Sequence, residues 1–302
     1  MKNRCLIVLN PGSGKNEKNA ALKAYLVESL PKFFVEFYMT KGENDYEQLE
    51  KSIKRFKPET VIVGGGDGTI RMVAPLLMHT NMIMGILPLG SANGLSKCLE
   101  IQDLENALTI INHGKVVPMD VLKINGEYCL HLADYGFNAN LIKNFEEKER
   151  RGMLGYLTSS VTEIFKVDPK IFEVLVDGQS VEVESKMVVI ANGNRYGTGA
   201  EINPGSKLSD GQFEIISINP ATIDDHLKMS LALYNGSIKD LPNVTCWQTG
   251  HCIIKNKQGA GFQIDGDWIG LLPEIEVTVE TQAIHIFVGG IDDDLAYKNS
   301  HG

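Results

Sequence analysis

The most constraining feature of the sequence is a short strand-like run, residues 60–63, that ends in a cluster of glycines. It leads into Gly64-Gly65-Gly66-Asp67-Gly68-Thr69, and residues 70–77 then have helical character. A strand that passes through such a turn into a helix is typical of parallel sheets, where ligands bind beyond the carboxyl ends of the strands. Glycines there let the backbone approach a phosphate and direct N–H groups at it.

An aspartate among these glycines adds a second constraint. Asp67 cannot accompany a phosphate unless a cation lies between the two, so the pattern suggests Mg²⁺ bridging to phosphates. The alternative is a glycine-rich turn that only connects the strand to the helix.

The first ~115 residues alternate strand-like and helix-like segments, which indicates a parallel sheet covered by helices. The strands are expected at residues 5–9, 33–38, 60–63 and 82–87, and the helices at 16–30, 45–55, 69–78 and from 92 to 98. The turns 10–15 and 88–94 also follow strands, so three polar, glycine-bearing turns should emerge at one edge of the sheet. The turn 10–15 does not have the spacing of a Walker A loop.

The pattern changes near Val116, and a domain boundary is expected close to Pro118. Apolar and polar residues then alternate with period two, which favours an antiparallel sandwich. The strand-like segments are 119–131, 170–190, 212–218, 245–254, 262–264, 275–279 and 284–288, and a mainly helical stretch covers 140–165. Two acidic turns, 207–211 and 263–268, belong to this part, and each can also be an ordinary Asp-Gly hairpin turn.

Charge and cysteine usage restrict the partners. The 302 residues carry a formal net charge of −9, which argues against nucleic acid and against strong electrostatic capture by anionic membranes. No run approaches the ~20 apolar residues of a membrane span, and residues 5–9 are interpreted as a first strand instead of a signal peptide. The five scattered cysteines indicate free thiols in a reduced compartment, so a cytoplasmic location is expected.

Taken in order, these motifs resemble the diacylglycerol kinase catalytic-domain superfamily, which includes bacterial lipid kinases, sphingosine kinases and ceramide kinases. The residues that carry the resemblance are Asn10-Pro11-Gly12-Ser13-Gly14, Gly65-Gly66-Asp67-Gly68-Thr69, Pro88-Leu89-Gly90-Ser91-Ala92-Asn93, Gly136-Phe137-Asn138-Ala139, Asn192-Gly193-Asn194 through Asn203-Pro204, Leu208-Ser209-Asp210-Gly211 and Asp265-Gly266-Asp267. They run along essentially the whole chain.

The resemblance implies an ATP-dependent, Mg²⁺-using lipid kinase with two domains and an active site in the cleft between them. Residues 1–118, with 289–302 returning, would form an α/β ATP-binding domain like those of NAD kinases and phosphofructokinases. Residues 119–288 would form an antiparallel β-sandwich for the lipid. The expected partner is a lipid substrate at the membrane surface, with peripheral contact at the inner membrane face and a homodimer as one option.

The resemblance also assigns roles to individual residues. ATP would be bound by Asn10, Ser13, Gly14, Thr40, Gly65, Gly66, Asp67, Gly68, Thr69 and Ser91. The catalytic residues would be Asp67, Asp120 and Asp267, of which Asp267 occupies the place of the family's general base, usually Glu. A structural Mg²⁺ would be held by Asp210 through its carboxylate and by Lys207 and Gln212 through their carbonyls.

Several positions depart from the family pattern and leave the acceptor open. Arg71 and Met72 replace the usual Asn and Glu, and Gly94 replaces an Asp. Asn138 and Asn140 are neutral where relatives carry an Asp, which weakens the case for a cationic sphingoid base.

The first hypothesis is therefore a kinase of a neutral lipid such as diacylglycerol, and three alternatives stay open. The first is a sphingoid-base kinase. The second, an NAD kinase-like enzyme, would pair the glycine cluster with an Asn-Glu dipeptide that the second domain lacks. The third is a non-catalytic nucleotide or lipid binder. A basic and apolar segment, 143–157, is either a membrane-facing edge or a solvated helix face.

Overall fold

The computed structural model describes residues 2–11, 16–136, 168–196 and 200–289. The chain divides into two compact units, Met1–Met119 with Gln282–Gly302 and Asp120–Thr281. Two strands pass from one unit to the other, β5 (Lys115–Ile124) and β16 (Glu274–Val288).

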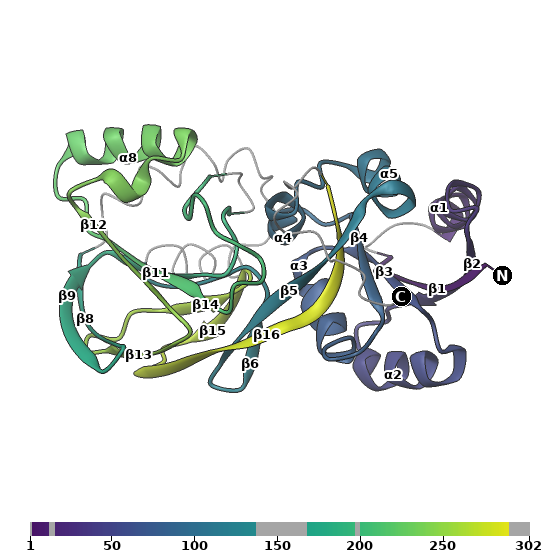
Figure 1. Cartoon of the computed structure of the whole chain (residues 1–302), viewed down its shortest axis with the longest axis horizontal. Coiled ribbons are helices and arrows are strands. Elements are labelled where there is room, and N and C mark those ends of the chain that lie inside the picture. The colour runs from purple at the N-terminus through teal and green to yellow at the C-terminus, as the bar shows by residue number, and fades with distance from the viewer. Residues whose placement is uncertain (1, 12–15, 137–167, 197–199, 290–302) are drawn as a thin grey trace, which may run out of the picture. The chain divides into compact units, whose positions relative to one another are not determined.

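The first unit is an α/β domain built on parallel strands. Its strands are β1 (Asn3–Leu9), β2 (Phe33–Met39), β3 (Thr60–Gly65) and β4 (Ile83–Pro88), and its helices are α1 (Asn16–Ser29), α2 (Asp45–Phe56), α3 (Asp67–Val73), α4 (Gly94–Cys98) and α5 (Leu104–His113). The sheet order is β2-β1-β3-β4-β16, and all four pairings are parallel. Helices α1 and α5 lie on one face and α2 on the other (Figure 1).

The carboxyl ends of these strands meet at one edge because the register is parallel. Leu9 pairs with Met39 and with Gly64, and Gly65 pairs with Pro88. The strand interiors are fully buried, with Leu6, Ile7 and Val8 as examples, which is the burial expected of a sheet covered on both faces. The turns that follow β1, β3 and β4 are therefore held on a rigid base.

Three helices of the first unit differ from the prediction: α5 was not expected, α4 begins two residues later than expected, and α3 is shorter than expected. The expected helix at 69–78 begins two residues earlier, at Asp67, and ends at Val73. Pro75 lies in the short 3₁₀ helix that follows, Ala74–Leu76. Proline has no N–H for an α-helical hydrogen bond and its ring clashes with the preceding turn, which explains the early end.

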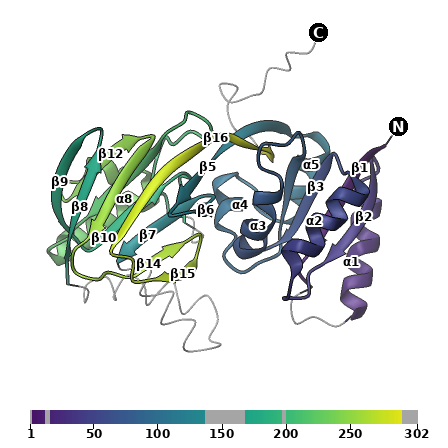
Figure 2. The ribbon, with the colours of Figure 1, turned by 90° about the horizontal axis from the view of Figure 1, so that it is seen from below.

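The second unit is an antiparallel β-sandwich, as its period-two pattern predicts. Its further strands are β6 (Glu127–Cys129), β7 (Leu132–Gly136), β8 (Lys170–Val176), β9 (Gln179–Ser185), β10 (Met187–Ala191), β11 (Phe213–Ile218), β12 (Val244–Thr249), β13 (His251–Asn256), β14 (Phe262–Ile264) and β15 (Asp267–Gly270). One sheet has the order β12-β11-β10-β7-β14-β15, so the β14–β15 hairpin forms an edge (Figure 2). The other contains β16-β13-β8-β9 and the β5–β6 hairpin. The core between them includes Tyr135, Phe172 and Phe262.

Strand β16 and helix α8 are two places where the second unit differs from the prediction. The segments 275–279 and 284–288 belong to one continuous strand, β16, which contains Gln282 at a φ of 48°. Helix α8 (Ile223–Asn235) covers the outer face of β10 and β11 through Met229 and Ala232. The expected helical stretch at 140–165, the segment 143–157 and the returning tail 290–302 lie outside the described residues.

Candidate active site

Three turns meet at the carboxyl edge of the first unit's sheet. The Asn10 N–H donates to the Gly64 carbonyl over 2.9 Å, which joins the turn after β1 to the turn after β3. The Leu89 N–H donates to the Gly65 carbonyl over 3.2 Å, which joins the turn after β4. We call residues 64–69, Asn10 and residues 88–93 the glycine edge.

Glycine is required at the glycine edge because the backbones approach one another closely. A Cβ added to Gly90 would lie 2.3 Å from the Gly66 Cα and 2.8 Å from its nitrogen. A Cβ on Gly65 would lie 2.5 Å from the Thr69 Oγ1. A Cβ on Gly68, by contrast, would meet nothing within 4 Å. The cluster therefore does more than connect a strand to a helix, since it packs two turns together.

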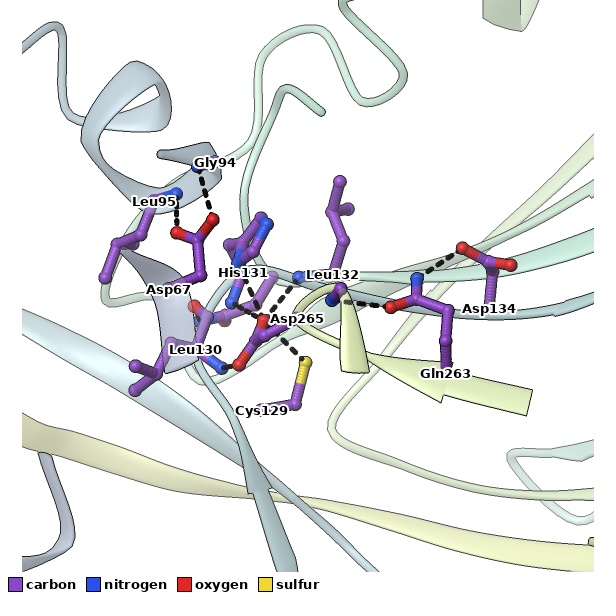
Figure 3. A network of polar contacts seen from close by, with 12 residues as sticks. Asp67, Gly94, Leu95, Cys129, Leu130, His131, Leu132, Asp134, Gln263 and Asp265 are labelled. Atoms are coloured by element: carbon purple, nitrogen blue, oxygen red, sulfur yellow. Dashed lines mark hydrogen bonds and ion pairs between the residues drawn. The ribbon is translucent and has the colours of Figure 1, made fainter. Parts of the chain in front are cut away.

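Asp67 connects the glycine edge to the start of helix α4. Its Oδ2 accepts the Gly94 N–H over 2.8 Å and its Oδ1 accepts the Leu95 N–H over 3.1 Å (Figure 3). The side chain is half-buried. An ionised carboxylate has about four acceptor positions. Both oxygens therefore keep the chemical capacity for a further contact, including one with a cation.

The other predicted nucleotide contacts gather at the same edge, with two exceptions. The Asn10 Nδ2 donates to the Thr69 Oγ1 over 3.4 Å, and the Thr40 N–H donates to the Leu9 carbonyl over 2.9 Å. Ser91 is exposed in the turn after β4, which Asn93 closes by binding both the N–H and the carbonyl of Gly90. Ser13 and Gly14 lie outside the described residues.

The acidic turn of the second unit is the two-residue loop of the β14–β15 hairpin. Asp265 and Gly266 have φ values of 49° and 90°, and left-handed values at both positions are the signature of a type I′ turn. Asp267, the predicted base, opens β15 opposite Ile264 and is half-buried. The Gln263 Oε1 accepts the Gly266 N–H over 2.7 Å, which fixes the turn from inside.

The carboxylate of Asp265 is buried, a feature that the sequence reasoning missed. It accepts the N–H groups of Leu130, His131 and Leu132 over 2.7, 3.0 and 3.2 Å (Figure 3). The His131 Nδ1 lies 2.7 Å from the Asp265 Oδ1. Burial raises the pKa of Asp265, but the opposing charge of His131 and these hydrogen bonds outweigh it, so the net pKa is lowered.

Asp120 and the predicted metal loop, residues 207–212, form a second connected group in this unit. Asp120 is fully buried, and its Oδ2 accepts the Gly211 N–H over 2.7 Å. The Asp120 N–H donates to the Leu208 carbonyl over 2.7 Å. Asp210 is exposed, and its Oδ1 accepts the Gln212 N–H over 3.1 Å. Asp120 therefore holds the backbone of the loop that carries Lys207, Asp210 and Gln212.

The oxygen set of this loop fits Mg²⁺ chemically. One carboxylate and two carbonyls are hard ligands, and Mg²⁺ is usually bound through one or two carboxylates with retained waters. In the ranges that the structure covers, no three His, Cys, Asp or Glu side chains gather as a ligand set. Buried Glu214 lies close by: burial raises its pKa, and the Asp210 charge adds to the rise while Asn203 opposes it.

Comparison with known proteins agrees with this two-part architecture. Residues 4–124 match the diacylglycerol kinase catalytic domain, and residues 133–288 match the YegS C-terminal NAD kinase beta sandwich-like domain. A diacylglycerol kinase of Bacillus subtilis strain 168 is 24% identical over 285 residues, 89% of this chain and 91% of the relative. The lipid kinase YegS of Escherichia coli K12 is 25% identical over 271 residues, 87% and 88% of the two chains.

A solved structure has the same fold. The crystal structure of a diacylglycerol kinase from Bacillus anthracis strain Sterne superimposes with a TM-score of 0.74 at 22% identity, covering 95% of this chain and 97% of that one. The chain belongs to the diacylglycerol kinase and YegS family of lipid kinases, as the ordered motifs predict. Among the helices that the structure describes, none combines the length and apolar character needed to cross a membrane.

Proposed function

We propose that this protein is an ATP-dependent kinase that phosphorylates the hydroxyl of a neutral lipid such as diacylglycerol. The observation that carries the nucleotide part is the glycine edge, where Gly66 and Gly90 pack together beside Asp67. Phosphoryl transfer depends on positioning and charge neutralisation, and a tightly packed, glycine-lined edge can supply the first. Family membership supports a lipid as the acceptor.

On the nucleotide side, the residues of the glycine edge would bind the phosphates and Asp67 would handle the metal that accompanies them. Asp67 already fixes the start of α4, so its carboxylate is held in one orientation. A bound Mg²⁺ would neutralise charge on the phosphates. The loop 207–212 would hold a structural Mg²⁺, with Asp120 keeping the loop in shape.

On the acceptor side, Asp267 would take the proton of the lipid hydroxyl as its oxygen attacks the γ-phosphorus and ADP leaves. A carboxylate is a suitable base for this step because it can accept the proton of the attacking hydroxyl, as an Asp does in the catalytic loop of protein kinases. Asp267 is one methylene shorter than the family's usual Glu. The turn that carries it is held by the contacts of Gln263 and Asp265, which limit where the carboxylate can lie.

The experiment is a radiolabelled ATP assay on purified protein with a panel of lipids in mixed micelles. We expect a chloroform-extractable product from diacylglycerol in the presence of Mg²⁺. The Asp67→Asn variant should be inactive, and its loss of activity would show that the product does not come from a contaminating kinase. Asp103→Asn is its matched control, because Asp103 also accepts a backbone N–H at a helix start, from Asn106 over 2.8 Å, away from the glycine edge.

The same panel separates the remaining alternatives. A product from sphingosine and from no other lipid would identify a sphingoid-base kinase. Phosphorylation of NAD in a coupled assay would identify an NAD kinase-like enzyme. ATP binding in calorimetry with no product from any acceptor would identify a non-catalytic binder. No ATP binding and no product would refute the kinase.

A lipid acceptor also implies contact with a membrane surface, and we infer a cytoplasmic protein that associates peripherally. Co-sedimentation with vesicles that contain diacylglycerol is the direct measurement. Binding that stays at background with and without the acceptor lipid would contradict this inference. Size-exclusion chromatography with light scattering tests the homodimer.

A further inference from the structure

A buried ion pair lies directly beside the predicted base. The side chains of His131 and Asp265 are 6% and 2% exposed, with 2.7 Å between Nδ1 and Oδ1. A second His–carboxylate pair in the same unit, His251 with Glu276, has a similar separation of 2.9 Å but is 54% and 61% exposed. The two pairs share chemistry and differ in burial, so only the first removes a charge from water.

The buried His131–Asp265 pair connects the β14–β15 turn to residues 130–132 and so fixes the position of the turn. An Asp at the first position of a type I′ turn needs no tertiary contact, since the turn is satisfied by its own backbone. Asp265 nevertheless accepts three consecutive N–H groups from residues 130–132, and its own N–H donates to the Leu132 carbonyl over 2.8 Å. An unpaired carboxylate would not be stable at this depth.

His131 is itself held in place from the other side. Its carbonyl accepts the N–H groups of Asn192 and Gly193 over 2.9 and 2.8 Å. Asn192 also donates through Nδ2 to the carbonyls of Asp120 and Leu130, both over 2.8 Å. These hydrogen bonds fix the backbone of His131, and the Nδ1 atom of its imidazole is the one that faces Asp265.

We propose that His131 is a positioning residue that acts through Asp265 to hold Asp267 in its reactive place. This inference deepens the proposed function and rests on it for the role of Asp267. We assign the proton to Nδ1 because this atom lies 2.7 Å from the Asp265 Oδ1, so that His131 supplies an N–H group at one fixed point. Displacing a reactive group by about 1 Å can lower a rate ~100-fold.

The choice of substitutions at His131 follows from the position of its Nδ1 group. Asn places an amide nitrogen close to the Nδ1 position, whereas Gln places it farther out and Leu removes it. We expect His131→Gln and His131→Leu to lower kcat by roughly 10- to 100-fold with an unchanged KM for ATP, and His131→Asn to stay within about threefold of wild type. The matched control is His251→Gln at the exposed pair, which should match wild type.

A double-mutant cycle distinguishes positioning from a general loss of structure. In an Asp267→Asn background there is no base left to position, so His131→Gln should cause no further drop. A drop of the same size in both backgrounds would overturn the proposal, as would full activity of His131→Gln. If His131→Asn were as poor as His131→Gln, an N–H donor at the Nδ1 position would not be what holds Asp267, and the proposal as stated would be overturned.

A readout without catalysis separates this inference from the proposed function. Amide hydrogen exchange at Gly266 reports opening of the turn, because that N–H is bound to the Gln263 Oε1. We expect faster exchange at Gly266 in His131→Gln and unchanged exchange in His131→Asn and His251→Gln. Unchanged exchange in His131→Gln would refute positioning even if wild type phosphorylates diacylglycerol. Faster exchange at Gly266 in His131→Gln, in a protein whose wild type has no kinase activity, would support the role of His131 in holding the turn and refute the proposed kinase function.

Discussion

The glycine edge of the first unit and the β14–β15 hairpin of the second use the same dipeptide, Asp-Gly, in opposite ways. In the first, Asp67 opens a helix, is half-buried and accepts two N–H groups from the start of α4. In the second, Asp265 is buried in a type I′ turn, accepts three backbone N–H groups and forms an ion pair with the side chain of His131. Both carboxylates bind consecutive backbone N–H groups from a distant segment.

The comparison teaches that the two sites divide the structural role and the proposed chemical role differently. At the glycine edge the flanking positions are glycines, so Asp67 combines the structural contact and the proposed metal contact. At the hairpin the two tasks are divided, because Asp265 makes the structural contacts and Asp267 is left half-buried two residues later. Substitutions at the hairpin should therefore separate activity from stability.

The largest expected effect follows from removing the proposed base. Asp267→Asn should lower kcat by roughly 10²- to 10⁴-fold, the usual contribution of general-base catalysis, with little change in unfolding free energy. Steady-state kinetics and urea denaturation measure the two quantities. Asp267→Glu, with the longer carboxylate, should keep a large part of the activity. An Asp267→Asn enzyme as active as wild type would remove Asp267 from the mechanism.

The next effect concerns the structural partner in the same turn. Asp265→Ala leaves three N–H groups and His131 without their acceptor, so we expect about 3–5 kcal/mol lower unfolding free energy. Asp103→Ala is the control, because it removes an exposed helix cap and should cost about 1 kcal/mol. A loss for Asp265→Ala no larger than that of the control would show that the buried carboxylate is not the lock of the turn.

A smaller effect tests the close packing of the glycine edge. Gly90→Ala would place its Cβ 2.3 Å from the Gly66 Cα, so the two turns must separate. We expect a loss of about 1–3 kcal/mol in stability and weaker ATP binding. Gly68→Ala, where the added Cβ meets nothing within 4 Å, should be neutral or slightly stabilising in the thermal unfolding measurement. Equal melting temperatures for the two variants would contradict the packing argument.

The smallest effect is the pH dependence of the stability that the buried Asp265 contributes. Because the folded-state pKa of Asp265 lies below its unfolded value of about 4, its ionisation contributes stability above that value. The contribution is lost as the pH falls through the folded-state pKa. The stability gap between wild type and Asp265→Asn, from urea denaturation, should therefore be widest near neutral pH and shrink below pH ~4. A gap that is constant down to acid pH would contradict the assignment.

Much of the fold follows from local sequence signals, and its exceptions have physical causes. The four parallel strands and their turns were predictable because each strand ends at glycine or polar residues. Helix α8 was missed, although Thr222 and Asp225 form a complete capping box that marks its start. The continuity of β16 could not be predicted, because Glu280, Thr281 and Gln282 interrupt the apolar alternation with polar residues.

The site was predictable in its parts but not in its connections. The three glycine-bearing turns were expected at one edge of the sheet, while the close approach of Gly66 to Gly90 depends on tertiary packing. Asp265 meets a segment more than 130 residues away, and no local pattern marks His131 as its partner. Asp120, predicted from the family as catalytic, lies buried beneath the loop that carries Asp210, and its role stays a prediction.

Strand β16 has a consequence for how this protein is made. His285 and Ile286 pair with Ile83 and Met84 of β4, so the sheet of the first unit receives its fifth strand from a segment about 200 residues downstream. During synthesis, β1 to β4 emerge long before that strand exists. The sheet of the first unit therefore lacks its fifth strand while residues 120–273 are translated, and it is completed only when β16 has been synthesised.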